Sequence, residues 1–182
     1  MSRISPEKRA EKVLNDCRIT EAPVPLDTIL TKESIQKALL PASDDVFGAI
    51  VRQNGVVVIA VNPNQHPNRQ RFTLAHELGH YFCHYKGTSD QVEHVDGDFR
   101  VHWRDQNSSS GMNWEEIEAN RFAAALLIPE AFLRRDLDTC RIIDRDMITH
   151  LASMYKVSRV AMQFRLINLG LLPPEIDPSA EV

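Results

Sequence analysis

The sequence lacks the features of membrane-bound and exported proteins. It has no run of about eighteen apolar residues, so no segment is predicted to span a membrane. The first residues, MSRISPEKRAEKVLNDC, are charged and contain no apolar stretch followed by a cleavage site, so we expect no secretion signal. Cysteine is scarce: Cys17, Cys83 and Cys140 are odd in number and far apart, which fits buried thiols better than a disulfide framework. These features favour a cytoplasmic location.

An excess of basic charge is also missing. The chain has 21 basic and 25 acidic residues and a formal net charge of −4. Binding of nucleic acid through bulk electrostatic attraction is therefore not expected. At 182 residues, the chain suits one domain with a small appendage and is long enough to bury a substantial core.

The most informative stretch is His76-Glu77-Leu78-Gly79-His80. Residues four apart lie on the same face of an α-helix, one turn from each other, so His76 and His80 can bind one ion together. Imidazole nitrogens are good ligands for Zn²⁺, and a catalytic zinc site needs a third protein ligand and a position for water. Glu77 is rotated by about 100° from His76, so its carboxylate can reach that water. The motif predicts a hydrolytic zinc site.

Chance is a poor explanation for this motif, because about 0.02 matches are expected from the composition. The alternative is an ordinary amphipathic helix on which the two histidines are packed and bind no metal. The apolar neighbours predict a half-buried helix, which is the setting that a metal site requires; they are Leu74, Ala75, Leu78 and Phe82. We therefore favour the metal site.

Local patterns predict both helices and strands around the motif. The hairpin is the clearest of these elements: its strands, 46–51 and 56–61, are joined through Asn54-Gly55, which suits a type I′ turn. A further strand is predicted at 34–40. Helices are predicted at 5–17, after the Pro-rich segment 22–29, and from about Asn68 through the motif. The pattern indicates an α+β fold with a small three-stranded, hairpin-based sheet.

Residues 87–111 are polar and weakly patterned, and we expect a long loop there. Loops of this length in a compact domain are usually lids or mobile segments. Four of its residues suggest a second metal site, but their spacing fits no recurrent pattern; they are His94, Asp96, Asp98 and His102. We interpret them as solvated loop residues.

The third ligand is expected on the helix predicted at 113–128. Its buried face is marked by residues at helical spacing, namely Ala119, Phe122, Ala123, Leu126 and Leu127. Extending this face towards the N-terminus reaches Glu115 and Glu116, whereas Glu118 is expected to point away. A carboxylate at the inner end of an apolar face is costly to bury unless it binds a cation. The pattern leaves Glu116 and Glu115 open as the third ligand.

Other third ligands fit less well. His84 continues the row from His80, but three ligands in one row along a helix cannot surround a tetrahedral ion. The metzincin pattern needs Gly and His where this sequence has Cys83 and Lys86, so that class is excluded. Cys83 is interpreted as a thiol outside the ligand set.

Three segments together resemble the ImmA/IrrE family of zinc metallopeptidases: RQRFTLAHELGHYFCH, EIEANRFAAALLIP and YKVSRVAMQFRLINLGLL. The resemblance extends over nearly the whole chain. It implies that His76, His80 and Glu116 bind zinc and that Glu77 is the general base. It also places Asn120 in the second shell, where related peptidases have Asp. An amide can accept a hydrogen bond from an imidazole N–H but adds no charge, so the ligand is expected to be less basic.

The resemblance also implies a fold and a function. It implies a zincin-like metallopeptidase domain at 1–136 and a C-terminal, helix-turn-helix-like helical subdomain at 137–182 that packs on it. The expected activity is zinc-dependent endopeptidase cleavage, with Mn²⁺ or another divalent ion as alternatives to Zn²⁺. Members of this family typically cut a helix-turn-helix repressor of a stress response or a mobile element. The expected partner is therefore a separate repressor protein, and the expected role is transcription regulation.

Some points stay open at the level of sequence. The oxyanion-stabilising residue is not identified, and Tyr81, Tyr85, His84, His102 and Arg104 are all candidates. We expect an exposed edge strand, 56–61, to pair with an extended peptide substrate.

Two rival functions also remain. In the first, the protein binds DNA through the tail from Asp144 to Leu172, whose sequence has a helix-turn-helix pattern. The low positive charge of this tail disfavours DNA binding. In the second, zinc is structural in a regulatory interaction protein. Structural zinc sites usually have four protein ligands, which the motif does not indicate.

Overall fold

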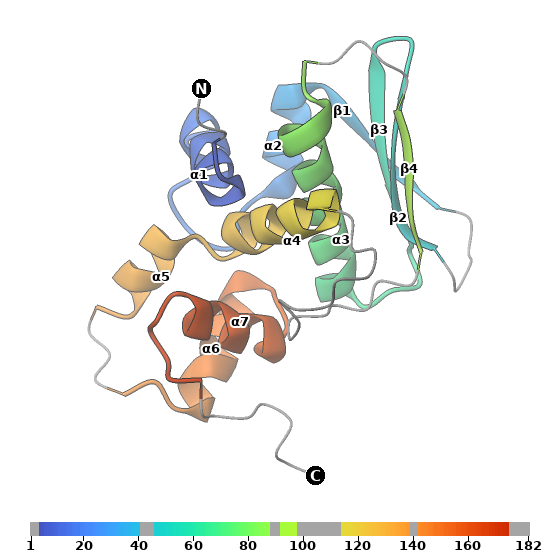
Figure 1. Ribbon diagram of the computed structural model, residues 1–182. Helices are drawn as coiled ribbons and strands as arrows, with labels where there is room; N and C mark the ends of the chain where they lie inside the picture. Colours follow the sequence, from blue (N-terminus) through green and yellow to red (C-terminus); the bar gives the residue numbers. More distant parts are fainter. Residues whose placement is uncertain (1–3, 41–45, 88–91, 98–113, 139–141, 175–182) are drawn as a thin grey trace.

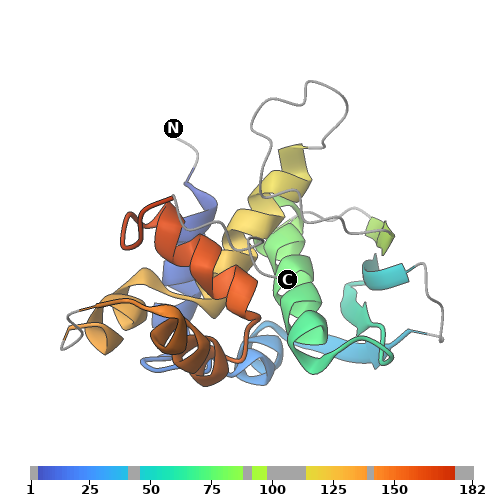
Figure 2. The ribbon, with the colours of Figure 1, turned by 90° about the horizontal axis from the view of Figure 1, so that it is seen from below.

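The computed structural model describes residues 4–40, 46–87, 92–97, 114–138 and 142–174. In this part of the chain the helices gather on one side of a mixed sheet, as Figures 1 and 2 show from two directions. The fold class is α+β, as predicted. Within the described residues, no helix combines the length and the apolar character that crossing a bilayer requires.

The sheet contains the three predicted strands and a fourth one. Its order is β1 (Ile35–Leu39), β3 (Val56–Val61), β2 (Val46–Gln53) and β4 (Val92–Gly97). β1 is parallel to β3, and the other neighbouring pairs are antiparallel. The predicted hairpin turn is confirmed, because Asn54 and Gly55 both have positive φ angles, 52° and 79°.

Two expectations about the sheet were wrong. β4 lies in the segment predicted to be a loop; its short, polar sequence gives little strand signal, and its pairing with β2 is a long-range contact. β3 was expected to be an exposed edge, but it lies between β1 and β2. Its apolar residues reflect this central position, and β1 and β4 form the edges of the described sheet.

The helices follow the predicted pattern closely. α1 (Pro6–Asp16) starts at Ser5, whose side chain accepts a hydrogen bond from the Lys8 backbone N–H. α2 (Leu26–Glu33) follows the Pro-rich segment, and α3 (Pro67–His80) carries the histidine motif. A π-helical turn, η1 (Tyr81–Tyr85), continues α3 directly. The remaining helices are α4 (Trp114–Leu127), α5 (Glu130–Asp136), α6 (Arg145–Tyr155) and α7 (Arg159–Asn168).

The C-terminal helix pair shares the hydrophobic core with the rest of the described chain. Leu151, Met162 and Leu166 are almost fully buried in the same cluster as the sheet and α3. Polar contacts join the same parts: Arg165 Nε donates to the Ile128 carbonyl at 3.0 Å, and Asn68 Nδ2 donates to the Val157 carbonyl at 3.0 Å. These contacts tie α7 and the turn before it to α3 and to the chain that follows α4.

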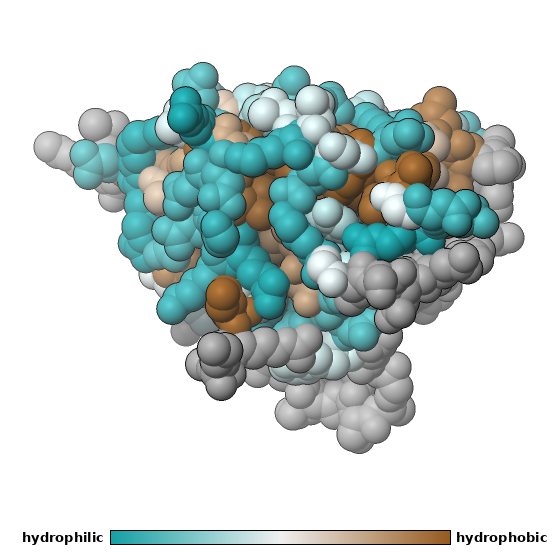
Figure 3. Space-filling view, turned by 90° about the horizontal axis from the view of Figure 1, so that it is seen from above, coloured by the Kyte–Doolittle hydropathy of each residue, from teal (hydrophilic) through white to brown (hydrophobic). Residues whose placement is uncertain are grey.

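Exposed hydrophobic side chains are scattered among the described residues. They are Ile4, Leu39, Val56, Trp114, Ile142, Met154 and Val160, which belong to different elements and loops. On the face shown in Figure 3, hydrophobic residues appear between hydrophilic ones. Single exposed hydrophobic residues are normal and do not by themselves indicate a docking surface.

Helices α3 and α4 cross at Gly79, and a prediction follows from this crossing. A Cβ atom on Gly79 would lie 2.7 Å from the Ala119 carbonyl oxygen and 2.8 Å from its Cα, so a side chain would push the two backbones apart. We expect Gly79→Ala to lower the free energy of unfolding by about 1–3 kcal/mol despite the better helix propensity of alanine. Chemical denaturation of the metal-free protein measures this, and an unchanged or higher midpoint would contradict it.

Candidate metal centre

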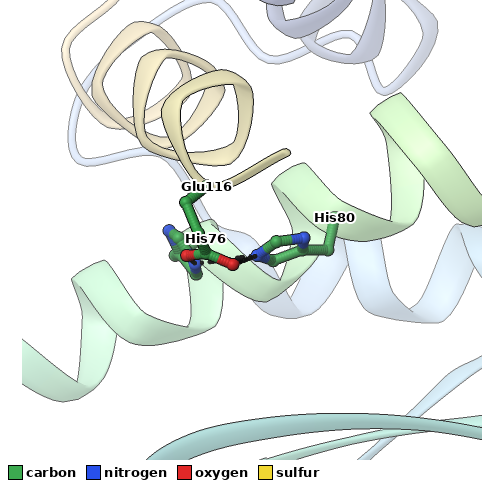
Figure 4. A group of neighbouring side chains, drawn as sticks. All are labelled: His76, His80 and Glu116. Atoms are coloured by element: carbon green, nitrogen blue, oxygen red, sulfur yellow. Dashed lines mark hydrogen bonds and ion pairs between the residues drawn. The ribbon is translucent and has the colours of Figure 1, made fainter. Parts of the chain in front are cut away.

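Two helices bring three potential ligands to one point. His76 and His80 project from α3, and Glu116 reaches them from the first turn of α4 (Figure 4). The two histidine Nε2 atoms are 2.9 Å apart, and the Glu116 oxygens lie 3.2 Å from His76 Nε2 and 3.1 Å from His80 Nε2. Ligands at about 2.0–2.1 Å from a tetrahedral ion are about 3.3 Å apart, so the spacing suits a small divalent cation.

Burial and charge also fit a cation. His76 and His80 are 0% exposed, and the Glu116 side chain is 26% exposed. Burial lowers the pKa of His80, against the opposing effect of its hydrogen bond with Glu116, which favours the neutral imidazole that a metal needs. Burial alone would raise the pKa of Glu116, but its contacts with the ring nitrogens of His76, His80 and His94 outweigh that effect and hold the pKa far below its usual value. The carboxylate is therefore ionised and ready to bind a cation.

The geometry distinguishes the two candidate carboxylates. Glu116 belongs to the cluster of mutually close ligand atoms, and Glu115 does not. The backbone oxygen of Glu115 lies 3.3 Å from His84 Nε2. His76, His80 and Glu116 are thus placed to bind a metal.

The expectation that Glu118 points away was wrong. Glu118 is buried, and its carboxylate lies 3.7 Å from His84 Nε2. The π-helical turn explains this contact: the Lys86 N–H donates to the Tyr81 carbonyl at 2.7 Å, five residues back. His84 lies in this turn, and its Nε2 faces Glu118 on α4. His84 is therefore not a third ligand on α3.

Glu77 fits beside the cluster because β2 has a glycine opposite it. Glu77 is 0% exposed, and a Cβ atom on Gly48 would lie 2.6 Å from Glu77 Oε1 and 2.4 Å from the Thr73 methyl group. Gly48 therefore leaves the space that the Glu77 carboxylate occupies. Sequence reasoning missed this residue, although a glycine inside a strand is a known signal of close approach.

Asn120 contacts the first ligand on the side away from the cluster. His76 Nδ1–H donates to Asn120 Oδ1 at 3.2 Å, which leaves the lone pair of Nε2 directed at the other ligands. This is the contact that a second-shell residue would make.

A prediction follows for Asn120. We expect Asn120→Ala to weaken metal binding by about 10- to 100-fold, because the His76 ring loses the partner that fixes its tautomer and orientation. Asn120→Asp keeps an acceptor, so its affinity should equal or exceed that of the wild type. Competition with a chromophoric chelator measures both values. Equal affinities for the wild type and Asn120→Ala would show that this contact does not orient His76.

His94 reaches the site from β4, so its interpretation as a solvated loop residue was wrong. Its Nε2 lies 3.1 Å from Glu116 Oε1, and its ring centroid is 4.2 Å from that of His80. The side chain is 22% exposed. The alternation of Val92, His94 and their neighbours could have suggested a short strand, but no local signal places that strand beside the histidine motif.

The residues that the sequence suggested as oxyanion-stabilising groups lie in different places. Tyr81 turns away from the cluster and donates its hydroxyl to Glu33 Oε2 at 3.2 Å. The Tyr85 ring stacks on His80 with a centroid distance of 6.1 Å. His102 and Arg104 lie outside the described residues, as do Asp98 and Cys140. Cys17 and Cys83 are half-buried, less enclosed than expected.

Comparison with known proteins identifies the family. The sequence model of the IrrE N-terminal-like domain, Peptidase_M78, matches residues 36–167, which is well over half of the chain. The chain belongs to the ImmA/IrrE metallopeptidase family. The matched range contains all three residues of the metal cluster, so the predicted resemblance and enzyme class are confirmed.

Similarity to solved structures extends this picture of the ImmA/IrrE fold. A Mycobacterium tuberculosis transcriptional regulator matches with a TM-score of 0.56 and 20% identity, over 89% of this chain and 46% of that one. This chain therefore spans about half the length of that protein, and the likeness concerns the fold alone. No curated protein matches the sequence.

Proposed function

We propose that this ImmA/IrrE protein is a zinc-dependent endopeptidase that cleaves a helix-turn-helix transcriptional repressor. The observation that carries the proposal is the convergence of His76, His80 and Glu116, with the buried Glu77 next to the first ligand. Two imidazoles and one carboxylate form a ligand set typical of catalytic zinc. Mn²⁺ and other divalent ions remain alternatives that metal analysis of the purified protein distinguishes.

Each residue has a role in hydrolysis under this proposal. A divalent ion held by the three ligands supplies Lewis acidity, which polarises the peptide carbonyl and makes water a stronger acid. Glu77 takes a proton from the water whose oxygen bonds to the carbonyl carbon, while the C=O π electrons move to the carbonyl oxygen. Glu77 then delivers that proton to the amide nitrogen as the C–N bond breaks. Asn120 holds the His76 ring so that Nε2 faces the other ligands.

Strand β4 offers a means of holding the substrate. It pairs with β2 on one side, and no strand in the described part of the chain pairs with its other side. An extended peptide can add to such an edge through main-chain hydrogen bonds. His94 belongs to this strand and contacts Glu116, so the edge runs close to the metal ligands. We thus propose that β4 pairs with the extended peptide substrate, a role that the sequence suggested for residues 56–61.

A regulatory role is supported by the family and by the fold. Members of the ImmA/IrrE family typically act on helix-turn-helix repressors, and the similar Mycobacterium tuberculosis protein is described as a transcriptional regulator. A cytoplasmic location and a part in a stress response are proposed on the same basis. We also propose the division into a peptidase domain at 1–136 and a helical subdomain at 137–182.

DNA binding by the C-terminal helix pair is the rival proposal. Met162 and Leu166 of α7 are buried in the common core, and the Val157 carbonyl before it is bonded to Asn68. The side of α7 that carries Met162 and Leu166 is therefore not available to DNA. In the first turn of α7, Arg159 is an exposed basic residue. This arrangement supports packing more than DNA recognition.

Incubation with candidate repressors tests the proposed function. The zinc-loaded protein is mixed with purified helix-turn-helix repressors encoded near its gene, and products are identified by mass spectrometry. We expect one repressor to be cut at a defined bond, with cleavage abolished by a chelator and restored by Zn²⁺. An intact set of repressors together with a salt-dependent gel shift of DNA by the full chain would favour the rival proposal.

A further inference from the structure

Three imidazoles contact Glu116, but two of them belong to the metal cluster. Glu116 Oε1 lies 3.1 Å from the Nε2 atoms of both His80 and His94. The mutually close ligand atoms include those of His76, His80 and Glu116, and His94 is outside that group. His94 thus places a ring nitrogen beside the ligands without joining them. At 22% exposed, its side chain also reaches solvent, whereas His76 and His80 are 0% exposed.

The sheet register places His94 on the same face as Glu77. In β2, Gly48 and Ile50 are two residues apart and face α3: Gly48 meets Glu77, and Ile50 is 1% exposed in the core. Ile50 is the direct partner of His94 on β4, and directly opposed residues point to the same face of a sheet. The ring of His94 therefore lies on the α3 side, as its contact with Glu116 requires.

The same strand register gives the distance along the sheet between the side chains of Glu77 and His94. Two residues of an extended strand span about 7 Å. Glu77 meets β2 at Gly48, and His94 is level with Ile50, so the two side chains are offset by that length along the strand. A peptide bond under attack by water needs a proton acceptor on the side of the water and a donor on the side of its carbonyl oxygen. The offset between Glu77 and His94 would allow the two side chains to lie on either side of a peptide bond that is held beside the metal ligands.

We infer that His94 is a catalytic residue whose Nε2, which meets Glu116 Oε1 in this structure, donates a hydrogen bond to the carbonyl oxygen of the scissile peptide bond once the substrate is bound. The inference rests on the proposed peptidase function and adds a residue to it. As the water oxygen bonds to the carbonyl carbon and its proton passes to Glu77, the C=O π electrons move to the oxygen, where negative charge develops. The N–H of His94 stabilises that charge. When the electrons return and the C–N bond breaks, the proton moves from Glu77 to the leaving nitrogen.

The described residues favour His94 over the tyrosines for this role. The Tyr81 hydroxyl is bonded to Glu33, and Tyr85 meets His80 through its ring. His84 contacts the Glu118 carboxylate and the Glu115 carbonyl on α4. His94 is carried by the edge strand that we propose as the docking strand for substrate, so peptide binding brings the scissile carbonyl towards it.

The test compares His94→Ala, His94→Gln and the matched control His150→Ala, which alters an exposed histidine on α6. Each zinc-loaded variant is assayed on a synthetic peptide that spans the bond cut in the repressor. We expect His94→Ala to lower kcat by about 100-fold with KM within about threefold, because the donor acts on developing charge. His94→Gln keeps an N–H donor and should recover at least tenfold of this loss. His150→Ala should behave as the wild type.

Measurements of the ligand set complete the test. We expect zinc affinity and the visible absorption spectrum of the Co²⁺-substituted protein to be the same in His94→Ala as in the wild type. A tenfold weaker affinity or a changed spectrum would overturn the inference, because His94 would then bind the metal or hold Glu116 in place. Wild-type activity in His94→Ala would also overturn it and leave the proposed function intact. If the wild type cut no peptide, both the inference about His94 and the proposed peptidase function would be contradicted.

Discussion

Glu77→Gln should reduce peptide hydrolysis by about a thousandfold while zinc remains bound. General acid–base catalysis contributes about 10²–10⁴-fold, and glutamine cannot accept the proton of the attacking water. The substitution keeps the size of the side chain, so it fits the space that Gly48 leaves. Neither His76 nor His80 is altered, so the ligand set is intact. Initial rates with the repressor peptide, together with metal analysis of the same samples, measure both parts of this result.

A matched change elsewhere controls for the loss of negative charge. Glu130→Gln removes a carboxylate from an exposed pair with Arg134 on α5, and exposed pairs of this kind contribute little to stability. We expect this variant to keep wild-type rates. If Glu77→Gln retained a tenth of the activity or more with zinc bound, another group would have to take the proton, and the mechanism would need a different base.

The metal site shows which parts of the protein local sequence can predict. The spacing of His76 and His80 fixes their common helix face, and the apolar face of α4 fixes which side meets the core. Local spacing did not decide between Glu115 and Glu116, because both lie at the end of that face. The decision comes from the crossing of α3 and α4, where Gly79 meets the Ala119 backbone and sets how the two helices face each other.

The features that sequence reasoning missed all depend on contacts between distant segments. β4 exists as a strand through its pairing with β2, and His94 joins the site through that pairing. Glu118 is buried on α4 and faces His84, which lies in the π-helical turn after His80. Periodicity cannot reveal such contacts, because it describes one element at a time.

The metal links two elements that are far apart in the sequence, so its binding should stabilise the fold. His76 and His80 lie on α3, and Glu116 lies on α4. A ligand that binds the folded state at about 1,000 times its Kd adds about 4 kcal/mol to the free energy of unfolding. The wild type should show this gain in zinc titrations monitored by chemical denaturation.

Glu116→Ala should abolish most of that gain. Loss of a direct ligand should weaken zinc binding by more than the roughly 10- to 100-fold expected for loss of a second-shell partner. At a zinc concentration that saturates the wild type, the variant should therefore unfold like its metal-free form and should not hydrolyse peptide. Glu115→Ala is the matched control, because it removes the neighbouring carboxylate, which is outside the metal cluster. If Glu115→Ala lost zinc and Glu116→Ala kept it, the assignment of the third ligand would be reversed.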